Sequence, residues 1–275
     1  MRIFWILFLL LGIYSFDYYK KEIYFVQYFP IENRDQQYQK WLSASVKISV
    51  NGTYGSGTII YYDSYKNLAY IATCGHLWNG TMTAAEGVNK KITCQITSWW
   101  QPQKLDKPKT YEARVIFYNN VAGSDTALLT FKPDWKPDYF PIANLNYKYK
   151  ENQYLNSLGC DKGSEVAHYK VKIVGIQKNN LITIENSPRP GRSGGGLMSE
   201  QYYVGTCWGT SSVDGTGYGY FTLLKAIHSV WERNGYGFLL NIKREYFAQK
   251  IKIIDKNSLQ KVYSKEYILI PYVKE

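Results

Sequence analysis

Ten short apolar runs follow one another between residues 45 and 208, and turn-forming residues separate many of them. The intervening Asn-Gly, Gly-Ser-Gly and Asn-Asn stretches are typical of tight turns between strands. Helical patterns are missing between the runs, and many short strands in succession predict an all-β barrel or sandwich. The predicted strands are residues 45–50, 57–62, 68–73, 91–97, 112–118, 126–131, 154–159, 170–177, 181–185 and 202–208.

The composition agrees with a folded β protein. Aromatic residues make up 17% of the 275 residues, which excludes a disordered chain. The formal net charge of +11 favours acidic partners such as anionic lipid or cell-wall polymer. The basic residues are spread without long runs, so they predict a solvated basic surface and no specific nucleic-acid site. An anionic surface or membrane stays open as a partner.

The N-terminus predicts export. Arg2 precedes residues 3–16, which carry no charge, and Asp17 and two lysines follow. This length suits a secretory signal better than a spanning helix, which needs about 20 apolar residues. We expect residues 1–19 to be a signal peptide or an uncleaved anchor and residues 20–41 to be a connector. The folded domain would then be secreted, periplasmic or membrane-anchored, outside the cytoplasm.

The main domain is expected to span residues 42–249. Near its end, residues 223–235 space their apolar side chains as a helix does and finish on Asn234-Gly235, a helix stop signal. Residues 250–275 alternate apolar and charged side chains and form a C-terminal extension.

The cysteines leave two alternatives open. Cys74, Cys94, Cys160 and Cys207 could form disulfides in an exported protein, in any of three pairings, or remain free buried thiols. The chain has no CxxC motif and only three histidines, so we expect neither a metal site nor another cofactor.

Ser193 is a candidate nucleophile. It lies among four glycines in residues 188–198 (PRPGRSGGGLM), between apolar strands on both sides. An attacking serine needs a turn whose backbone N–H groups point at the oxyanion that it creates, and glycine permits such a turn. A serine hydroxyl also needs a base, which is usually a histidine oriented by a carboxylate.

His76 and Asp125 are placed to supply these groups. His76 follows a strand at a small-residue turn (YIATCGH), and Asp125 stands directly before a strongly apolar strand (DTALLTF). A carboxylate at such a position is costly unless its oxygens accept hydrogen bonds. Of the other histidines, His168 is expected at the surface and His228 at a junction between helix and barrel.

These stretches together resemble the trypsin/chymotrypsin-like serine peptidases. The residues IATCGH at 71–76, DTALL at 125–129 and GRSGG at 191–195 are similar to the family's histidine, aspartate and serine motifs, in the family's order. The form PGRSGG is most like the bacterial and viral branches, including glutamyl endopeptidases and HtrA-type proteases. The resemblance implies a mostly β fold of two six-stranded antiparallel barrels, followed by a C-terminal helix.

The resemblance also implies roles for individual residues. Ser193 would attack the peptide carbonyl, His76 would transfer the proton and Asp125 would orient the imidazole. The amides of Gly191 and Ser193 would form the oxyanion hole. Ser187, Cys207, Trp208 and Gly209 would bind a protein or peptide substrate, residues 206–209 by strand pairing. The chain is thus predicted to be an endopeptidase that works through an acyl-enzyme.

Two residues depart from the family's pattern. Digestive enzymes carry an aspartate at the position of Arg192 and pair it with a newly released N-terminal amine. Activation by such an ion pair is therefore not expected here. The charge of Arg192 could instead perturb the histidine or occlude the cleft. Cys207 argues against glutamyl specificity, and a small or apolar residue before the cut bond is favoured.

Parts of this sequence pattern also occur in other classes of protein. Gly-x-Ser-x-Gly is also the nucleophile elbow of α/β-hydrolases, but the hairpin pattern after Ser193 excludes the helix which that fold requires. A catalytically inactive peptidase fold that serves as a binding module on a membrane or virion surface is the main alternative. A polymer-binding surface protein is a third, motivated by the charge and the tyrosines.

Overall fold

Two β-barrels form the described part of the chain. The computed structural model describes residues 36–79, 86–87, 92–177, 179–214 and 216–240, which belong to one compact unit. The predicted signal or anchor and the extension at 250–275 lie outside the described residues. Among the described helices, none is both long enough and apolar enough to span a membrane.

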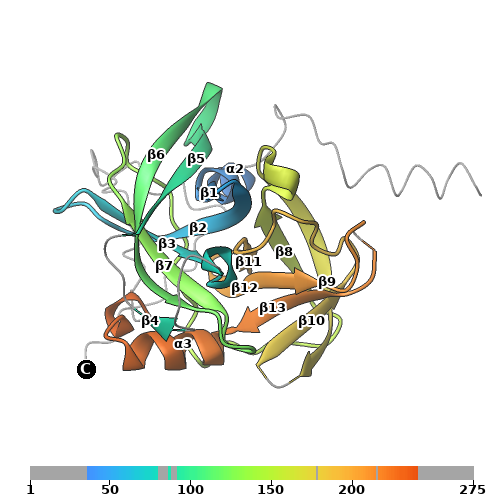
Figure 1. Cartoon of the computed structure of the whole chain (residues 1–275). Coiled ribbons are helices and arrows are strands. Elements are labelled where there is room, and N and C mark those ends of the chain that lie inside the picture. Colours follow the sequence, from blue (N-terminus) through green and yellow to red (C-terminus); the bar gives the residue numbers. More distant parts are fainter. Residues whose placement is uncertain (1–35, 80–85, 88–91, 178, 215, 241–275) are drawn as a thin grey trace, which may run out of the picture. The chain divides into compact units, whose positions relative to one another are not determined.

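The first barrel is closed by strands that pair in the order β6-β5-β1-β2-β3-β7, with β7 returning to β6, and the short β4 is added to the edge of β6 (Figure 1). All its pairings are antiparallel. Its strands are β1 (Ser45–Val50), β2 (Thr53–Asp63), β3 (Leu68–Thr73), β4 (Glu86–Gly87), β5 (Thr93–Gln101), β6 (Gln103–Asn119) and β7 (Thr126–Phe131).

The second barrel closes in the order β10-β13-β12-β11-β8-β9, and its pairings are again antiparallel. Its strands are β8 (Tyr154–Gly159), β9 (Ala167–Gln177), β10 (Asn180–Ile184), β11 (Gly196–Met198), β12 (Tyr203–Thr210) and β13 (Gly219–Leu223). The predicted architecture of two six-stranded barrels is therefore confirmed.

Both barrels are filled by the inward-facing side chains of their strands. In β10 the buried positions alternate, with Leu181 and Thr183 inside, as a strand with one face on the core requires. Strand β7 is buried along its whole length, which matches its unbroken apolar sequence. Fully buried aliphatic side chains fill the two interiors, among them Ile48, Ile59, Ile71, Val115, Leu129, Val171, Leu181 and Leu197.

Two helices flank the barrels. Helix α2 (Gln36–Ser43) begins in the predicted connector, extends two residues into the predicted domain and is followed by β1. Helix α3 (Leu224–Arg233) buries Leu224, Ile227 and Trp231, which recur on one helical face. After the helix ends at Arg233, Gly235 turns the chain with a φ of +83°, and its N–H donates a hydrogen bond to the Glu232 carbonyl. The predicted C-terminal helix is thus confirmed. It begins at Leu224, one residue after its predicted start at residue 223.

Candidate active site

His76 stands where the chain leaves the first barrel after β3. Cys74 and Gly75 follow the strand, and a short 3₁₀ helix η2 (His76–Trp78) begins at the histidine. Gly75 permits this turn, because a Cβ atom there would lie only 2.2 Å from the Asn119 carbonyl oxygen. The glycine therefore lets the backbone pass close to the end of β6 and fixes where His76 emerges.

Asp125 holds this turn and the imidazole together. Its Oδ2 accepts a hydrogen bond of 2.5 Å from His76 Nδ1, and its Oδ1 accepts from the amides of Gly75 and His76. The hydroxyl of Thr222 in the second barrel donates to the Asp125 carbonyl at 2.9 Å. The carboxylate is 6% exposed, so these bonds meet the predicted need for partners at a buried acid. They also fix the histidine tautomer that leaves Nε2 as an acceptor.

Cys74 contacts the other ring nitrogen. Its Sγ lies 3.7 Å from His76 Nε2, within hydrogen-bonding distance for sulfur. A thiolate at Cys74, were it to form, and the hydrogen bond to Asp125 both raise the pKa of His76 above its ordinary value. Burial raises the pKa of Cys74 itself, so the thiol persists at neutral pH and Asp125 is the anion that acts on His76.

Ser193 lies on a turn between β10 and β11 that packs against this corner. A Cβ atom on Gly194 would lie 2.0 Å from Thr73 Oγ1 and 3.0 Å from the Cys74 amide nitrogen. The serine is therefore held next to the strand end that carries His76. Among the described residues, however, Ser193 Oγ makes no hydrogen bond to His76, whose Nε2 faces Cys74.

Both barrels hold the backbone of this turn. Ser56 of β2 donates its amide to the Ser193 carbonyl at 2.7 Å and its hydroxyl to the Gly191 carbonyl at 2.8 Å. From the second barrel, the Cys207 carbonyl accepts from the Gly194 amide at 2.7 Å. Gly191 and Gly194 adopt φ of +91° and +85°, which other residues rarely tolerate. The glycines of the motif are thus required by the turn.

The two backbone amides that are predicted to form the oxyanion hole make no hydrogen bond among the described residues. Within the described part of the chain, the amides of Gly191 and Ser193 donate no hydrogen bond, whereas the neighbouring amides of Arg192, Gly194 and Gly195 all do. Both residues are partly exposed, while Arg192 between them is buried. Their position on either side of Arg192 agrees with an anion-binding role.

Arg192 takes neither of the two roles that the sequence left open for it, perturbing the histidine or occluding the cleft. The side chain is fully buried in the second barrel, where it forms a bidentate ion pair with Asp161. A guanidinium can be buried at such a place because the carboxylate and nearby carbonyls satisfy its donors. The charge is therefore neutralised inside the barrel, not directed at His76.

The predicted substrate-binding residues occupy two elements. Ser187 is buried, and its hydroxyl donates to the Gly217 carbonyl. On β12 the pairing with β11 ends at Thr206, while the pairing with β13 continues to Thr210. Cys207 still exchanges backbone hydrogen bonds with Gly194 and Gly195, so residues 208–210 are the ones paired on one side only within the described sheet, as a strand that receives a substrate backbone must be.

The side chains on this edge of β12 differ in exposure. Cys207 is buried, whereas Trp208 is half-buried, stacks on Tyr220 and donates its Nε1 to Asn180 at 3.0 Å. A Cβ atom on Gly209 would meet nothing within 4 Å, so open space lies beside this residue. Trp208 and Gly209 are therefore accessible, whereas Cys207 is not available to a substrate as predicted, because its side chain is buried and its backbone N–H and C=O bond Gly195 and Gly194.

The remaining histidines and cysteines have structural environments. His228 is buried on α3 and hydrogen-bonds the Ala143 carbonyl, as expected at a helix–barrel junction. His168, predicted at the surface, is half-buried on β9, where it hydrogen-bonds Asn156 at 2.8 Å and makes a tilted ring contact with Trp41 of α2. All four cysteines are free and buried, which decides between the two alternatives that the sequence left open.

Cys74, His76 and Asp125 also bring three potential metal ligands within 4.8 Å of one another. The Asp125 oxygens are already used by two amides and by Nδ1, which leaves Sγ and Nε2 as the available donors. Zinc sites use three or four protein ligands, so this donor set is incomplete for zinc. The cluster is better described as a hydrogen-bonded unit.

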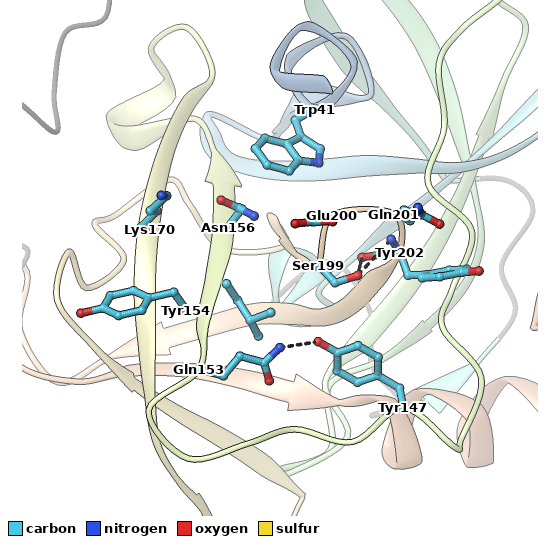
Figure 2. A pocket seen from close by; sticks show the side chains of 11 residues that line it. Trp41, Tyr147, Gln153, Tyr154, Asn156, Lys170, Ser199, Glu200, Gln201 and Tyr202 are labelled. Atoms are coloured by element: carbon cyan, nitrogen blue, oxygen red, sulfur yellow. Dashed lines mark hydrogen bonds between the residues drawn. The ribbon is translucent and has the colours of Figure 1, made fainter. Parts of the chain in front are cut away.

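A hollow of about 530 Å³ lies elsewhere, between α2, β8, β9 and the β11–β12 turn. Figure 2 shows Trp41 on one side and the Gln153 amide directed at the Tyr147 hydroxyl, to which it donates at 3.1 Å. None of the predicted site residues lines this hollow. The candidate site therefore depends on the geometry around His76 and Ser193 and not on this pocket.

Two residues of the site could not be found by motif. Ser56 lies in a Gly-Ser-Gly stretch that the sequence marks only as a turn, and Asp161 carries no local signal at all. Both act on the nucleophile turn from segments far away in sequence. Cys74 stands inside the histidine motif, but its contact with Nε2 depends on the turn at Gly75.

Comparison with known proteins identifies the fold. No family model and no curated protein matches the chain. A serine endoprotease from Yersinia pestis matches with a TM-score of 0.53 and 20% identity over 72% of this chain, and the chain spans only 65% of that protein. The inactive form of Rv3671c from M. tuberculosis H37Rv matches at 0.52 and 17%, covering 74% and 91% of the two chains.

A scabies mite inactivated protease paralogue is also similar, with a TM-score of 0.50 and 14% identity, covering 71% of this chain and 95% of that one. Likeness at these identities concerns the fold, while activity depends on the site. With two closed six-stranded barrels and the nucleophile turn held by both of them, the chain has the fold of the trypsin/chymotrypsin-like serine peptidases.

Proposed function

We propose that the protein is a serine endopeptidase that cleaves peptide bonds through Ser193, His76 and Asp125. The observation that carries this proposal is the hydrogen bond from His76 Nδ1 to Asp125 Oδ2 next to a serine turn with two unengaged amides. Nucleophile, base and orienting acid are the parts that acyl transfer requires.

In the proposed reaction, Ser193 Oγ attacks the peptide carbonyl carbon while its proton passes to His76 Nε2. Asp125 keeps the proton of Nδ1 in place and stabilises the imidazolium that forms. His76 then gives the proton to the leaving amine, and the C–N bond breaks to leave an acyl-enzyme on Ser193. A water molecule, deprotonated by His76, releases the acid in the same manner.

For this step Ser193 Oγ must replace the Cys74 thiol as the partner of Nε2. The proposal assigns this exchange to a rotation of the serine side chain about χ1, since the backbone of the turn is held by Ser56 and Cys207. Such rotations between staggered positions are fast and inexpensive. Catalytic hydrogen bonds are often long or absent before the substrate binds.

The amides of Gly191 and Ser193 would bind the oxyanion of the tetrahedral intermediate. One oxyanion donor typically contributes about 10²–10³ in kcat, since the donors are fixed before charge develops. The substrate backbone would pair with the free edge of β12 at Trp208 and Gly209, and Ser187 would lie near the pocket for the residue before the cut bond. A small or apolar residue there remains our expectation.

Export of the active domain is part of the proposal. It depends on residues 1–19, which lie outside the described part of the chain, and on the uncharged segment within them. Partners would be proteins or peptides met outside the cytoplasm. The net charge of +11 would favour substrates or surfaces that are acidic.

A fluorophosphonate probe tests the nucleophile and the base together. The full-length protein, Ser193→Ala and His76→Ala are incubated with the probe, and covalent labelling is measured. We expect the probe to label the wild type and to leave both variants unlabelled. Ser64→Ala, which removes a hydroxyl from an exposed turn, is the matched control and should label as the wild type does.

An inactive peptidase-fold binding module remains the second candidate. It is favoured by the contact between Cys74 Sγ and His76 Nε2 and by the similarity to an inactivated paralogue. Folded wild-type protein that resists the probe at every pH between 6 and 10 would reject the peptidase and leave this candidate.

A further inference from the structure

Arg192 is a cation with no access to solvent, directly between the two predicted oxyanion donors. Its Nε donates to Asp161 Oδ1 at 2.8 Å and its Nη2 donates to Asp161 Oδ2 at 3.0 Å. Its Nη1 donates to the carbonyls of Ser157 and Ala167 at 3.1 and 3.2 Å. The guanidinium also lies over the ring of Tyr169, 4.2 Å from its centroid.

Asp161 is held in turn by the same group of residues. The Tyr169 hydroxyl donates to Asp161 Oδ2 at 2.9 Å, so one oxygen receives two hydrogen bonds. A bidentate arginine–carboxylate pair fixes orientation as well as distance, which a lysine could not do. The ion pair is therefore a rigid anchor inside the second barrel.

The backbone around Arg192 depends on this anchor. Gly159 allows the side chain to pass, because a Cβ atom there would lie 2.7 Å from Arg192 Cγ. The Arg192 amide donates to the Arg189 carbonyl, and the Arg192 carbonyl accepts from Gly195. The bond to the Arg192 carbonyl orients the peptide group that carries the Ser193 amide. The peptide group that carries the Gly191 amide is held by the Pro190 carbonyl, which accepts from the amide of Lys162, next to Asp161.

We propose that Arg192 and Asp161 are positioning residues that hold the oxyanion-binding amides of Gly191 and Ser193 in place, an inference that rests on the proposed peptidase function. The anchor lies wholly within the described barrel. It therefore needs no amine released by cleavage elsewhere in the chain.

The test compares full-length wild type with Arg192→Met, Arg192→Lys, Asp161→Asn and the double variant Arg192→Met/Asp161→Asn. Saturation labelling with a fluorophosphonate gives kinact, the maximal rate, and KI, the probe concentration at half of this rate. Lys109 on β6 forms an ion pair of 3.1 Å with Asp134, which follows β7. The variant Lys109→Met breaks this pair and is the matched control. Circular dichroism identifies the variants that are folded at the assay temperature.

We expect kinact to fall at least about tenfold in Arg192→Met and Asp161→Asn, with KI within about twofold of wild type, since only transition-state contacts are lost. Arg192→Lys should recover part of kinact. The double variant should fall no further than Arg192→Met, because the two residues act as one unit. Lys109→Met should match the wild type.

Hydrogen exchange gives a readout that does not depend on activity. Peptides covering residues 188–198 should exchange faster in Arg192→Met and Asp161→Asn, while peptides covering β7 stay unchanged. Unchanged kinact in folded Arg192→Met and Asp161→Asn overturns the positioning role, as does additive loss in the double variant. If the wild type is not labelled, the peptidase proposal fails, whatever the variants do. If residues 188–198 also exchange hydrogen at the same rate in wild type and variants, the anchoring role of Arg192 and Asp161 is overturned as well.

Discussion

Cys74 Sγ lies 3.7 Å from His76 Nε2, on the nitrogen that a catalytic base offers to its nucleophile. The thiol donates a weak hydrogen bond there, because Nδ1 already donates to Asp125. Cys74 therefore competes with Ser193 for the base in the free protein.

Replacing this thiol should make the base more available. We expect Cys74→Ala to raise the rate of fluorophosphonate labelling about two- to fivefold, since a hydrogen bond of this kind is worth about 0.5–1 kcal/mol. The lost packing should lower the free energy of unfolding by about 1 kcal/mol. Labelling kinetics and urea unfolding measure the two effects. A labelling rate below that of the wild type would show that the thiol assists the base.

The pH dependence of labelling should reflect the raised pKa of His76. The base acts only when unprotonated, so the rising limb of the rate should lie above the ordinary histidine value of about 6.5. Asp125→Asn removes the neighbouring anion and should move that limb to lower pH. The same variant should lower the maximal rate by about 10⁴, the loss known for this substitution in the serine-protease triad. A wild-type limb at or below pH 6 would contradict this assignment.

The same shift affects stability, with a definite sign. A raised pKa means that the folded state binds the His76 proton more tightly than the unfolded state does. This contribution is complete below the unfolded pKa of about 6.5 and is lost as the pH rises through the folded pKa. Urea midpoints of wild type and His76→Gln should therefore converge as the pH increases above 7. Parallel midpoints over the whole range would argue against it.

Much of the fold could be predicted because apolar patterns mark buried strands. Residues 45–50, 68–73, 126–131 and 154–159 were assigned to strands with the bounds that the structure has. Strand β6 begins nine residues before its predicted start at residue 112, because its first half is polar, mostly exposed and paired only in a hairpin with β5. Strand β11 is three residues long, too short to show a period.

Site residues that belong to local sequence motifs could be predicted. Residues that act through contacts between distant parts of the chain could not. His76 and Asp125 were inferred from two separate stretches, and the structure joins them by a hydrogen bond. The role of Arg192 was misjudged, because Asp161, its partner, lies 31 residues away with nothing to mark it. Burial of a charge cannot be read from a sequence until its counter-ion is known.

The nucleophile turn should tolerate no side chain at Gly194. Its φ is +85°, and a Cβ atom would lie 2.0 Å from Thr73 Oγ1 and 2.3 Å from the Ser56 carbonyl oxygen. Gly52 has a similar φ of +79° but nothing within 4 Å, so it isolates the backbone cost. We expect Gly52→Ala to lose about 1 kcal/mol of unfolding free energy and Gly194→Ala at least about 2 kcal/mol more. Equal losses in urea unfolding would mean that the turn adapts.

The four thiols should resist reagents and oxidation in the folded protein. Burial raises the pKa of Cys94 and Cys160 to about 12, and Cys74 and Cys207 are also shifted upwards by burial. Thiol reagents and disulfide exchange require an accessible thiolate, so buried thiols can persist even in an oxidising compartment. The cysteines would then remain free after export.

Counting thiols tests this directly. With Ellman's reagent at pH 8 we expect no reaction in the native protein and four thiols after denaturation in guanidinium chloride. Ser64→Cys, on an exposed turn, should add one thiol that reacts at once and thereby calibrates the native measurement. Two thiols instead of four in denaturant would reveal a disulfide and contradict the free state. Rapid reaction of one thiol in the native protein would show that part of the structure opens to the reagent. Loss of that rapid reaction in Cys74→Ala would identify the thiol as Cys74, so the opening would lie beside His76.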